Sequence, residues 1–502
     1  MANFPILSLT LFLPIIAAII IMLIPREQVK LIKIMAAITT FISLALSIIV
    51  FVSYDQTIGG LQFVERIPWT ADLGVTYALG VDGISIPMLL LTTLIGFSAV
   101  FASWQIKDRI KEFFVLLLIL ITGVMGTFLT TDLFIFFLFY EVVVIPIYLM
   151  VIMWGSSKRV TKEYAGMKLT IYLLIGSAFL LIGLIMLFVQ SYLMNGTPTM
   201  DIFELATMQF STGFQILVFA LMAFGFGTLL SMFPFHAWSP DGYAGAPTAV
   251  SMIHAGVLKK IGGYGLIRIG LFLLPEGAQV IAPIIAVLAI GNIVYAALIC
   301  LSQRDLKYIV GYSSVSHMGY VLIGIAALNL ISLNGAIIMM FAHGVMAALF
   351  FAMIGNLYEK SHTRNIDDLG GLAHQMPRLA TGFMLAGLAS LGLPGLVNFV
   401  GEFTIFIGAF STFKVLTIIA VSGIIFTAVY ILRTLGTVLF GPRREEWDHL
   451  QDLKGVEMVP LLVLGAAIIL GGFFPFALMD LINNGVGSLL AQIGSIQIGG
   501  IF

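Results

Sequence analysis

The sequence predicts an all-α, polytopic membrane protein with about fourteen transmembrane helices. Of its 502 residues, 60% are apolar and 10% are charged, and its mean hydropathy is +1.09. A soluble domain is about one quarter charged and less than half apolar, so this composition excludes a water-soluble fold. The apolar stretches are long and continuous, whereas a transmembrane β-barrel needs short alternating segments. The spans are therefore expected to be helical.

Runs of about twenty apolar residues, the length that crosses a bilayer as a helix, define the predicted spans. The longest hydrophilic connections, 54–83 and 192–212, are too short to hold a catalytic domain, so residues 1–502 are expected to form a single membrane domain. The predicted helices lie near residues 4–24, 32–53, 84–104, 112–130, 133–154, 167–191, 213–233, 247–273, 279–301, 307–327, 330–358, 378–410, 414–440 and 457–478.

Lysine and arginine residues gather in every second connection. The even-numbered connections hold only Arg66 and Lys414, and the seventh, around Pro240 and Asp241, has no basic residue. By the positive-inside rule the odd-numbered connections lie in the cytoplasm and both termini lie on the outer face. The odd-numbered connections carry Arg26, Lys30, Lys33, Lys107, Arg109, Lys111, Lys158, Arg159, Lys162, Lys168, Arg304, Lys307, Lys360, Arg364, Arg378, Arg443, Arg444 and Lys454.

Six charged residues remain inside the predicted spans: Glu141, Lys259, Lys260, Arg268, Glu402 and Arg433. A charge at the centre of a membrane helix costs roughly 2.5 to 3.5 kcal/mol on insertion scales, so each should be paired or functional. Arg268 and Arg433 lie near helix ends, where their side chains can reach the interface. The other four either form structural ion pairs or belong to a proton relay, in which buried carboxylates and lysines exchange protons.

Three histidines, His254, His317 and His343, lie on apolar helices. Each alone is equally well explained as a hydrogen-bonded core residue, but together with the buried charges they favour a hydrated polar axis. Their spacing does not suggest a metal site. A single cysteine, Cys300, cannot hold an iron–sulfur cluster, which takes about four thiolates. Any redox chemistry is therefore assigned to other chains.

Two predicted helices contain breaks. Pro234 interrupts the seventh, and Pro394, between Gly392 and Gly395, interrupts the twelfth. Helices 4–8 (residues 112–273) and 9–13 (residues 279–440) then form two five-helix units with the break in the fourth helix of each, as in an inverted-repeat transporter. The alternative is that these residues only kink the helices for packing.

Several motifs resemble the antiporter-like subunits of respiratory complex I. The similarity runs from about residue 70 to about residue 440. Among the sister types the chain resembles the M, or chain-4, type, because Glu402 stands where the L and N types carry a lysine. The motifs are LGVDGIS at 79–85, FYE at 139–141 with Pro146, PFHAW at 234–238 through Asp241, APT at 246–248, AGVLKK at 255–260 with GYG at 263–265, DLK at 305–307, YSSVSHMG at 312–319 and NFVGEF at 398–403.

The resemblance implies a proton-translocating subunit of an NADH:quinone oxidoreductase in the bacterial inner membrane. In the family a carboxylate of the fifth helix pairs with a lysine of the seventh, protons cross to a lysine of the eighth, and the twelfth helix releases them. Glu141, Lys260 and Glu402 match these positions, and His317 and His343 match the connecting histidines. The implied partners are sister membrane subunits, small membrane subunits and a peripheral redox module. FMN, iron–sulfur clusters and quinone are then expected on other subunits, and no cofactor on this chain.

One family residue does not match. The lysine of the seventh helix stands five residues before the proline that corresponds to Pro234, and here that position is Leu229. Our hypothesis is that Lys259 substitutes for the missing charge, because adjacent helical residues point about 100° apart and Lys259 can face the fifth or seventh helix. The alternatives are a subunit of a cation/proton antiporter or of a membrane-bound hydrogenase-type complex, or a structural subunit whose channel has decayed.

The segment after Asp480 carries no further charge and alternates glycine with apolar residues. We expect the tail from Asp480 to Phe502 to pack at the membrane interface against a neighbouring subunit.

Overall fold

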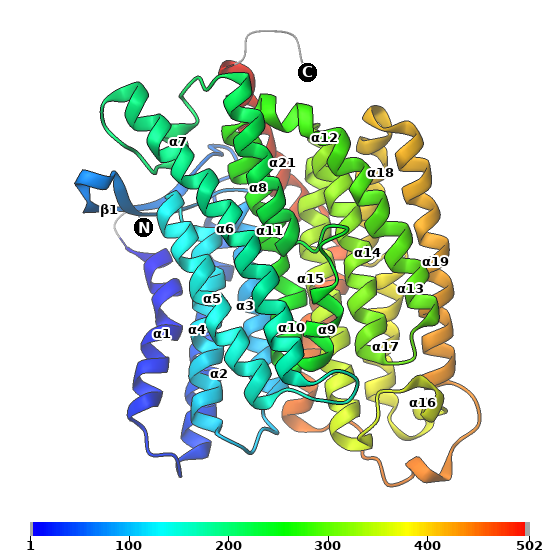
Figure 1. Cartoon of the computed structure of the whole chain (residues 1–502). Coiled ribbons are helices and arrows are strands. Elements are labelled where there is room, and N and C mark those ends of the chain that lie inside the picture. Colours follow the sequence, from blue (N-terminus) through cyan, green and yellow to red (C-terminus); the bar gives the residue numbers. More distant parts are fainter. Residues whose placement is uncertain (1–3, 497–502) are drawn as a thin grey trace.

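The structure, a computed structural model, describes residues 4–496 as one bundle of long helices (Figure 1). Within those residues, twelve helices are long and apolar enough to cross a membrane. Two further segments run along the bundle: 248–271 is one continuous helix that alternates α and π turns, and 377–412 is broken between Ser390 and Val397. The all-α membrane fold is therefore confirmed, while the count of fourteen spans and the two repeats stay predictions.

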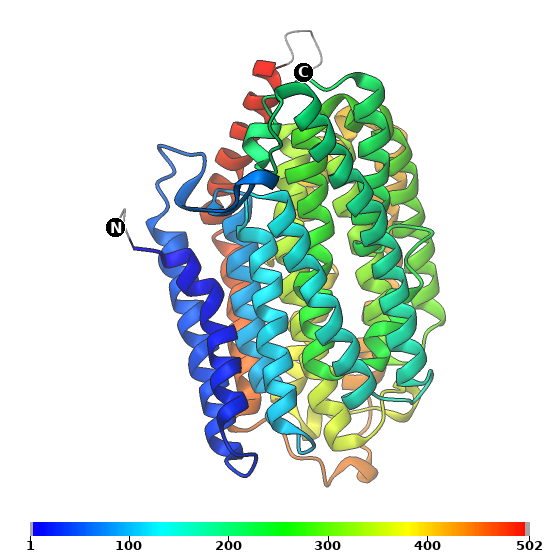
Figure 2. The same ribbon diagram turned by 60° about the vertical axis from the view of Figure 1, so that its left-hand side comes forward.

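The first half of the chain builds one side of the bundle, with α1 and α2 at its edge (Figure 2). Its elements are α1 (Ile6–Leu23), α2 (Val29–Ser53), β1 (Gln62–Thr70), β2 (Val75–Val81), α3 (Ser85–Ala102), α4 (Ile110–Leu129), α5 (Leu133–Trp154), α6 (Lys162–Asn195), α7 (Ile202–Leu205), α8 (Thr212–Leu229), α9 (Trp238–Gly245), α10 (Thr248–Ile253) and α11 (Lys259–Gly265).

The second half encloses α14 and α15, whose residues are almost all buried. Its elements are α12 (Pro275–Ile290), α13 (Ala296–Ser302), α14 (Leu306–Ala326), α15 (Leu330–Ser361), α16 (Leu372–Gln375), α17 (Pro377–Ser390), α18 (Val397–Thr412), α19 (Lys414–Leu439), α20 (Val459–Phe473) and α21 (Phe476–Ile496).

Both predicted helix breaks are present. The helix α8 ends at Leu229 and α9 begins at Trp238, so Pro234 lies in the gap; α17 ends at Ser390 and α18 begins at Val397, so Pro394 lies in the second gap. In Figure 1, α8 and α18 occupy the upper part of the bundle and α9 and α17 the lower part. Each break therefore lies partway along the length of the bundle, and Pro234 and Pro394 are themselves exposed on its side.

The helix that follows the first break has an unusual turn. Between α10 and α11, residues His254–Leu258 form a π-helical turn, and Leu266–Leu271 form another. A π turn holds one residue more than an α turn and is frequent at functional sites. The turn at His254–Leu258 comes directly before the two adjacent lysines of α11.

The connection 54–83, for which the sequence analysis named no element, contains two strands. It holds an antiparallel hairpin of β1 and β2. The strand β1 is mostly exposed, so it lacks the alternation of buried and exposed residues from which a strand is predicted. Glu65 in β1 accepts hydrogen bonds from the backbone N–H groups of Leu7 and Ser8, at 2.8 and 3.0 Å. These hydrogen bonds thus hold the hairpin against the first turn of α1.

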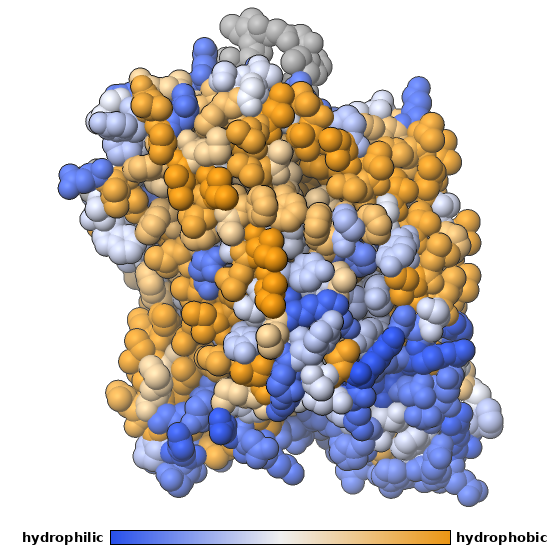
Figure 3. Space-filling view, viewed as in Figure 1, coloured by the Kyte–Doolittle hydropathy of each residue, from blue (hydrophilic) through white to orange (hydrophobic). Residues whose placement is uncertain are grey.

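Polar residues gather at the lower end of the bundle, and apolar residues cover most of the rest of the face seen in Figure 3. The connections between α1 and α2, α3 and α4, and α5 and α6 lie at this lower end, while α1 begins and α21 ends nearer the opposite end (Figures 1 and 2). We call the lower end the basic end, because it carries the basic connections named above.

The described part of the tail packs against its own chain, and its expected contact with a neighbouring subunit stays a prediction. The helix α21 continues to Ile496 and packs against α15 of the same chain. Asn334 of α15 donates a hydrogen bond to Asn483 at 2.8 Å, and Asn484 donates one to the backbone oxygen of Gln56 at 3.1 Å. Residues 497–502 lie outside the described residues.

Candidate functional site

The structure brings Lys260 and His343 into direct contact at the centre of the bundle. Lys260 Nζ lies 2.8 Å from His343 Nδ1, and both side chains are fully buried. Lys260 also donates to the carbonyl of Ala255, inside the π turn. A side chain added at Gly344 would lie 2.5 Å from the Gly256 carbonyl. Two glycines therefore let α15 and the eighth helix approach closely enough for this contact.

The contacts continue from His343 to Glu402. The rings of His343 and His317 are 5.5 Å apart between centroids, and His317 Nδ1 lies 3.4 Å from Glu402 Oε1. His317 belongs to α14 and Glu402 to α18, the helix that follows the second break. His317 and Glu402 are both buried. Four of the predicted residues thus form one line across three helices and the half-helix α18.

Hydroxyl groups surround the far end of this line. Ser390, the last residue of α17, lies 3.1 Å from His317 Nε2, and its hydroxyl lies 3.4 Å from that of Ser313. Tyr430 of α19 donates to Ser313 at 2.8 Å. The second break therefore supplies both a hydroxyl for His317 and, after the turn, the carboxylate of Glu402.

Lys259 points in a different direction from Lys260. Its Nζ lies 3.2 Å from Ser314 Oγ on α14 and 5.2 Å from the ring centroid of Tyr243 on α9. Its side chain is fully buried. Of the two helices named in our hypothesis, Lys259 therefore faces the seventh and not the fifth.

His254 lies between aromatic rings at the start of the π turn. Its ring stacks on Trp238 with centroids 5.1 Å apart and meets Tyr243 edge-on at 5.3 Å. It is 1% exposed, and neither ring nitrogen has a hydrogen-bond partner among the described residues. A buried imidazole without protein partners is unusual and points to contact with water or with a proton carrier.

Glu141 is apart from the other predicted residues. It is half-buried, and Phe134 and Ile145 on the same face of α5 are 41% and 65% exposed. Within residues 4–496, no hydrogen bond or ion pair reaches its carboxylate. Leu229 ends α8 and is buried. The ion pair that the family resemblance implies between the fifth and seventh helices is therefore not formed among the described residues: Glu141 is present without a partner, and Leu229 stands in place of the lysine.

The two arginines expected to reach the interface behave differently from one another. Arg268 is 5% exposed and forms a buried ion pair with Asp82, so the expectation for it is wrong. The acidic partner lies in the connection before α3, far from Arg268 in the sequence. Arg433 is partly exposed and donates to the carbonyls of Leu301 and Gln303 at 2.5 and 3.2 Å, near the end of α13.

Several residues of this region were missed by the sequence reasoning. The sequence analysis places Lys307 in a cytoplasmic connection, but in the structure it lies in the first turn of α14 and is 3% exposed. Ser313 and Ser314 lie four and three residues before His317, a spacing that places them on its helix face and could have identified them. Ser390 and Tyr430 carried no signal, because only the tertiary structure brings them to His317.

The arrangement suits proton transfer better than bond chemistry. Lysine, imidazole and carboxylate groups can each take and release a proton, and the line from Lys260 to Glu402 places them in sequence inside an apolar bundle. Among the described residues, no group of three or more histidine, cysteine, aspartate or glutamate side chains is arranged to hold a metal ion.

Comparison with known proteins agrees with this geometry. Residues 130–427 match the family "NADH:quinone oxidoreductase/Mrp antiporter, TM". The chain is 40% identical over 484 residues to NAD(P)H-quinone oxidoreductase chain 4 1 of Synechococcus sp. (strain JA-3-3Ab), covering 94% of this chain and 90% of the relative. It is 36% identical over 502 residues to NADH-quinone oxidoreductase subunit M of Rickettsia conorii, covering 98% and 100%.

Among solved structures, respiratory complex I from Thermus thermophilus contains a chain with a TM-score of 0.87 and 26% identity, covering 96% of this chain and 99% of that one. The family match spans more than half of the sequence, and the relatives are aligned over nearly their full length. The chain therefore belongs to the NADH:quinone oxidoreductase/Mrp antiporter transmembrane family.

Proposed function

We propose that this chain is the M-type, proton-translocating membrane subunit of an NADH:quinone oxidoreductase of the complex I kind. The observation that carries the proposal is the buried line Lys260, His343, His317 and Glu402, in which each residue contacts or faces the next. The relatives named as chain 4 and subunit M of such oxidoreductases support it.

In the proposed reaction a proton passes from the Lys260 ammonium through the two imidazoles to the Glu402 carboxylate. An imidazole can accept a proton on one ring nitrogen and release one from the other, so His343 and His317 can relay a proton without leaving their helices. The second break places Gly392 next to Glu402 and the hydroxyl of Ser390 on His317, so polar groups surround the carboxylate. Glu402 is thus suited to the releasing step.

The free energy for this transfer must come from other subunits. Moving one proton against 100 mV costs about 2.3 kcal/mol, and this chain has no reaction of its own to supply it. The FMN, iron–sulfur clusters and quinone site of such an oxidoreductase would lie in a peripheral module and its neighbours. The chain would then take part in the enzyme as a translocating subunit, beside sister and small membrane subunits.

In this proposal the basic end faces the cytoplasm of a bacterium, and the chain lies in the inner membrane with both termini on the outer face. The excess of lysine and arginine at that end supports this orientation. Glu141, on the outward face of α5, is separated from Lys260 within this chain, and its exposure suits contact with a neighbouring subunit.

Two substitutions test the relay in the intact complex. In inside-out membrane vesicles, Lys260→Met and Glu402→Gln should lower the number of protons moved per electron pair transferred to quinone. Lys30→Met, an exposed lysine at the basic end, serves as the control and should leave that ratio unchanged. Normal pumping in both relay variants, with the complex assembled, would contradict the relay.

A second experiment distinguishes the alternative assignment, a cation/proton antiporter or membrane-bound hydrogenase-type complex. The chain is tagged in its host, the membranes are gently solubilised, and co-purifying proteins are identified by mass spectrometry. Sister antiporter-like chains together with iron–sulfur subunits and a flavin-binding subunit would support the oxidoreductase. If the chain co-purifies only with small cation-antiporter subunits, the antiporter assignment replaces the oxidoreductase assignment.

A further inference from the structure

We infer that protons reach this chain through a cavity at its basic end and load onto Lys259, which takes the place of the lysine missing from the seventh helix. This inference rests on the proposed function and adds the route by which protons reach the buried lysines. The observations are a cavity, two contacts between the eighth helix and α14, and the π turn between them.

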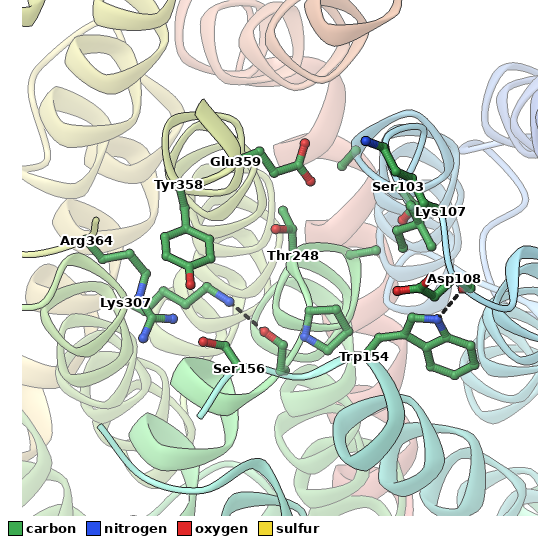
Figure 4. Close-up of a pocket in the computed structure, with 15 residues that line it drawn as sticks. Ser103, Lys107, Asp108, Trp154, Ser156, Thr248, Lys307, Tyr358, Glu359 and Arg364 are labelled. Carbon is green, nitrogen blue, oxygen red and sulfur yellow. Dashed lines mark hydrogen bonds between the residues drawn. The ribbon is translucent and has the colours of Figure 1, made fainter. Parts of the chain in front are cut away.

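The cavity has a volume of about 240 Å³ and opens at the basic end. Exposed residues form its mouth, among them Lys107, Asp108 and Glu359. Lys307 and Arg364, which are 3% and 4% exposed, line its inner wall. Figure 4 shows Lys307 and Arg364 on one side of the cavity and Lys107 and Asp108 on the other. The Lys307 ammonium donates a hydrogen bond to the backbone carbonyl of Ala246. A cavity with this many polar groups can hold water.

The first contact begins at the inner wall of the cavity. Lys307 Nζ donates to the Ala246 carbonyl at 2.6 Å and lies 3.4 Å from Ser251 Oγ. Ser251 is fully buried and belongs to α10, the first part of the eighth helix. His254, with its two unpartnered ring nitrogens, follows one turn later. Lys307 and Ser251 therefore lead from the cavity wall to the helical turn that carries His254.

The second contact is that between Ser314 and Lys259, at 3.2 Å. Ser314 lies seven residues after Lys307 on α14, about two turns away on the same face. Lys259 lies eight residues after Ser251, about 12 Å along the eighth helix at 1.5 Å per residue. The helices α14 and α10–α11 thus face each other at two levels, one at the cavity and one at the buried lysines.

The π turn explains how Lys259 comes to share a face with Ser251. In a regular α-helix, eight residues exceed two turns by about 80°, so residue 259 would point sideways. One α turn of about 3.6 residues and one π turn with an additional residue bring eight residues close to two complete turns. Lys259 then faces α14, and Lys260, one residue on, faces His343 of α15.

The two lysines accordingly have different neighbours. Lys259 faces the cavity side, and Lys260 begins the line to Glu402. Two ammonium groups so close together repel each other, so a proton arriving on Lys259 favours departure of the proton on Lys260. Glu141 and Leu229 have no part in this route, which agrees with the exposure of Glu141 and the absence of a charge at position 229.

The cavity is tested by placing a cysteine in its wall. Ser156 lines the cavity, while Ser157, the next residue, is exposed and lies outside it. The only native cysteine, Cys300, is buried. Ser156→Cys and Ser157→Cys complexes in inside-out vesicles are treated with a positively charged, membrane-impermeant methanethiosulfonate, and labelling of this chain is verified by mass spectrometry. Wild-type complexes treated identically account for thiols of other subunits.

We expect both cysteines to be labelled, with proton pumping lost only in Ser156→Cys and reduced to the level of Lys260→Met. Failure to label Ser156→Cys, or normal pumping after labelling, would overturn the cavity as the inlet. Lys260→Met is measured beside it: normal pumping in that variant would contradict the proposed relay, whereas impaired pumping there with no effect at Ser156 contradicts the inlet alone.

Loading of Lys259 is tested with hydroxyl and lysine variants. Lys259→Leu and Ser314→Ala should both lower the protons moved per electron pair, while Glu141→Gln should lower it less than Lys259→Leu. Ser316→Ala is the matched control, because Ser316 is equally buried on α14 but bonds the backbone oxygen of Ile293. Equal losses in Ser314→Ala and Ser316→Ala, or normal pumping in Lys259→Leu, would refute the loading step.

Discussion

At the scale of single residues, Glu402 is positioned by a glycine as well as by His317. Gly392 has a φ of +70°, a conformation in which other residues are strained, and a Cβ added there would lie 2.3 Å from Glu402 Oε2. The side chain of Glu402 thus occupies the space that any residue except glycine would need. The turn between α17 and α18 and the carboxylate must therefore change together.

Gly392→Ala should impair pumping by displacing the Glu402 carboxylate, in addition to backbone strain of about 1–2 kcal/mol. Gly196→Ala separates these effects, because Gly196 has a similar φ of +75° with no atom within 4 Å of the added Cβ. Thermal unfolding of the purified complex and protons moved per electron pair are measured for both variants. Equal pumping in the two variants would show that contact with Glu402 is unimportant.

Two adjacent residues of one type have different environments in this chain. Lys259 meets Ser314 and Tyr243, whereas Lys260 meets His343 and a backbone carbonyl. Their separation in space follows from the 100° between consecutive helical residues. Two adjacent lysines in a membrane helix can therefore contact two different neighbouring helices.

At the scale of elements, the connection before α3 is joined to the eighth helix by the Asp82–Arg268 ion pair. Asp82 also accepts hydrogen bonds from the N–H groups of Ile84 and Ser85, both at 3.0 Å, so it begins α3 as well. The side chains of Asp82 and Arg268 are 8% and 6% exposed. One carboxylate thus fixes the outer part of α3 against the helix that carries both lysines.

Removing that carboxylate should be costly, because it leaves the Arg268 charge buried and unpaired. We expect Asp82→Asn to destabilise the chain by about 3–5 kcal/mol. Asp367→Asn is the comparison: its pair with Arg304 has side chains 52% and 60% exposed and should contribute about 0–1 kcal/mol. The two are compared by thermal unfolding and by the yield of assembled complex. A similar small effect in both would contradict a structural role for the buried pair.

At the scale of the whole molecule, the bundle has a polar, basic end and a line of buried titratable residues from Lys260 to Glu402. In the proposed route, the cavity and Lys307 lead to this line from the basic end, and Glu402 lies at its far end, beside the second break. The proposed transfer takes its free energy from outside the chain, so it requires neighbouring subunits whose conformations bias it. The outward face of α5, with Glu141, is one surface on which such a bias can act.

The orientation of the whole molecule is testable by labelling from each side. Gln28→Cys, in the connection between α1 and α2, should react with an impermeant thiol reagent only in inside-out vesicles. Asn195→Cys, at the end of α6 near the opposite end, should react only in right-side-out vesicles. Both positions are exposed, so a difference in labelling reflects sidedness and not burial. The reverse pattern would place the basic end outside.

The sequence by itself determined the all-α membrane class, the two breaks and the set of polar residues inside the spans. These features follow from local physical chemistry: hydrocarbon thickness sets the length of an apolar run, proline and glycine interrupt a helix, and charges inside spans are too costly to be incidental. Lys260, His317, His343 and Glu402 were among the polar residues found in apolar runs, and the family resemblance distinguished them from the others.

Only the tertiary structure decided which of these residues meet. The isolation of Glu141, the Asp82–Arg268 pair and the hydroxyl of Ser390 beside His317 depend on contacts between segments distant in the chain, which no local pattern encodes. The π turn that directs Lys259 toward α14 is likewise invisible in the sequence, because one residue more per turn leaves composition and hydropathy unchanged. Residue types set which groups can carry a proton, and helix packing set the order in which they can exchange it.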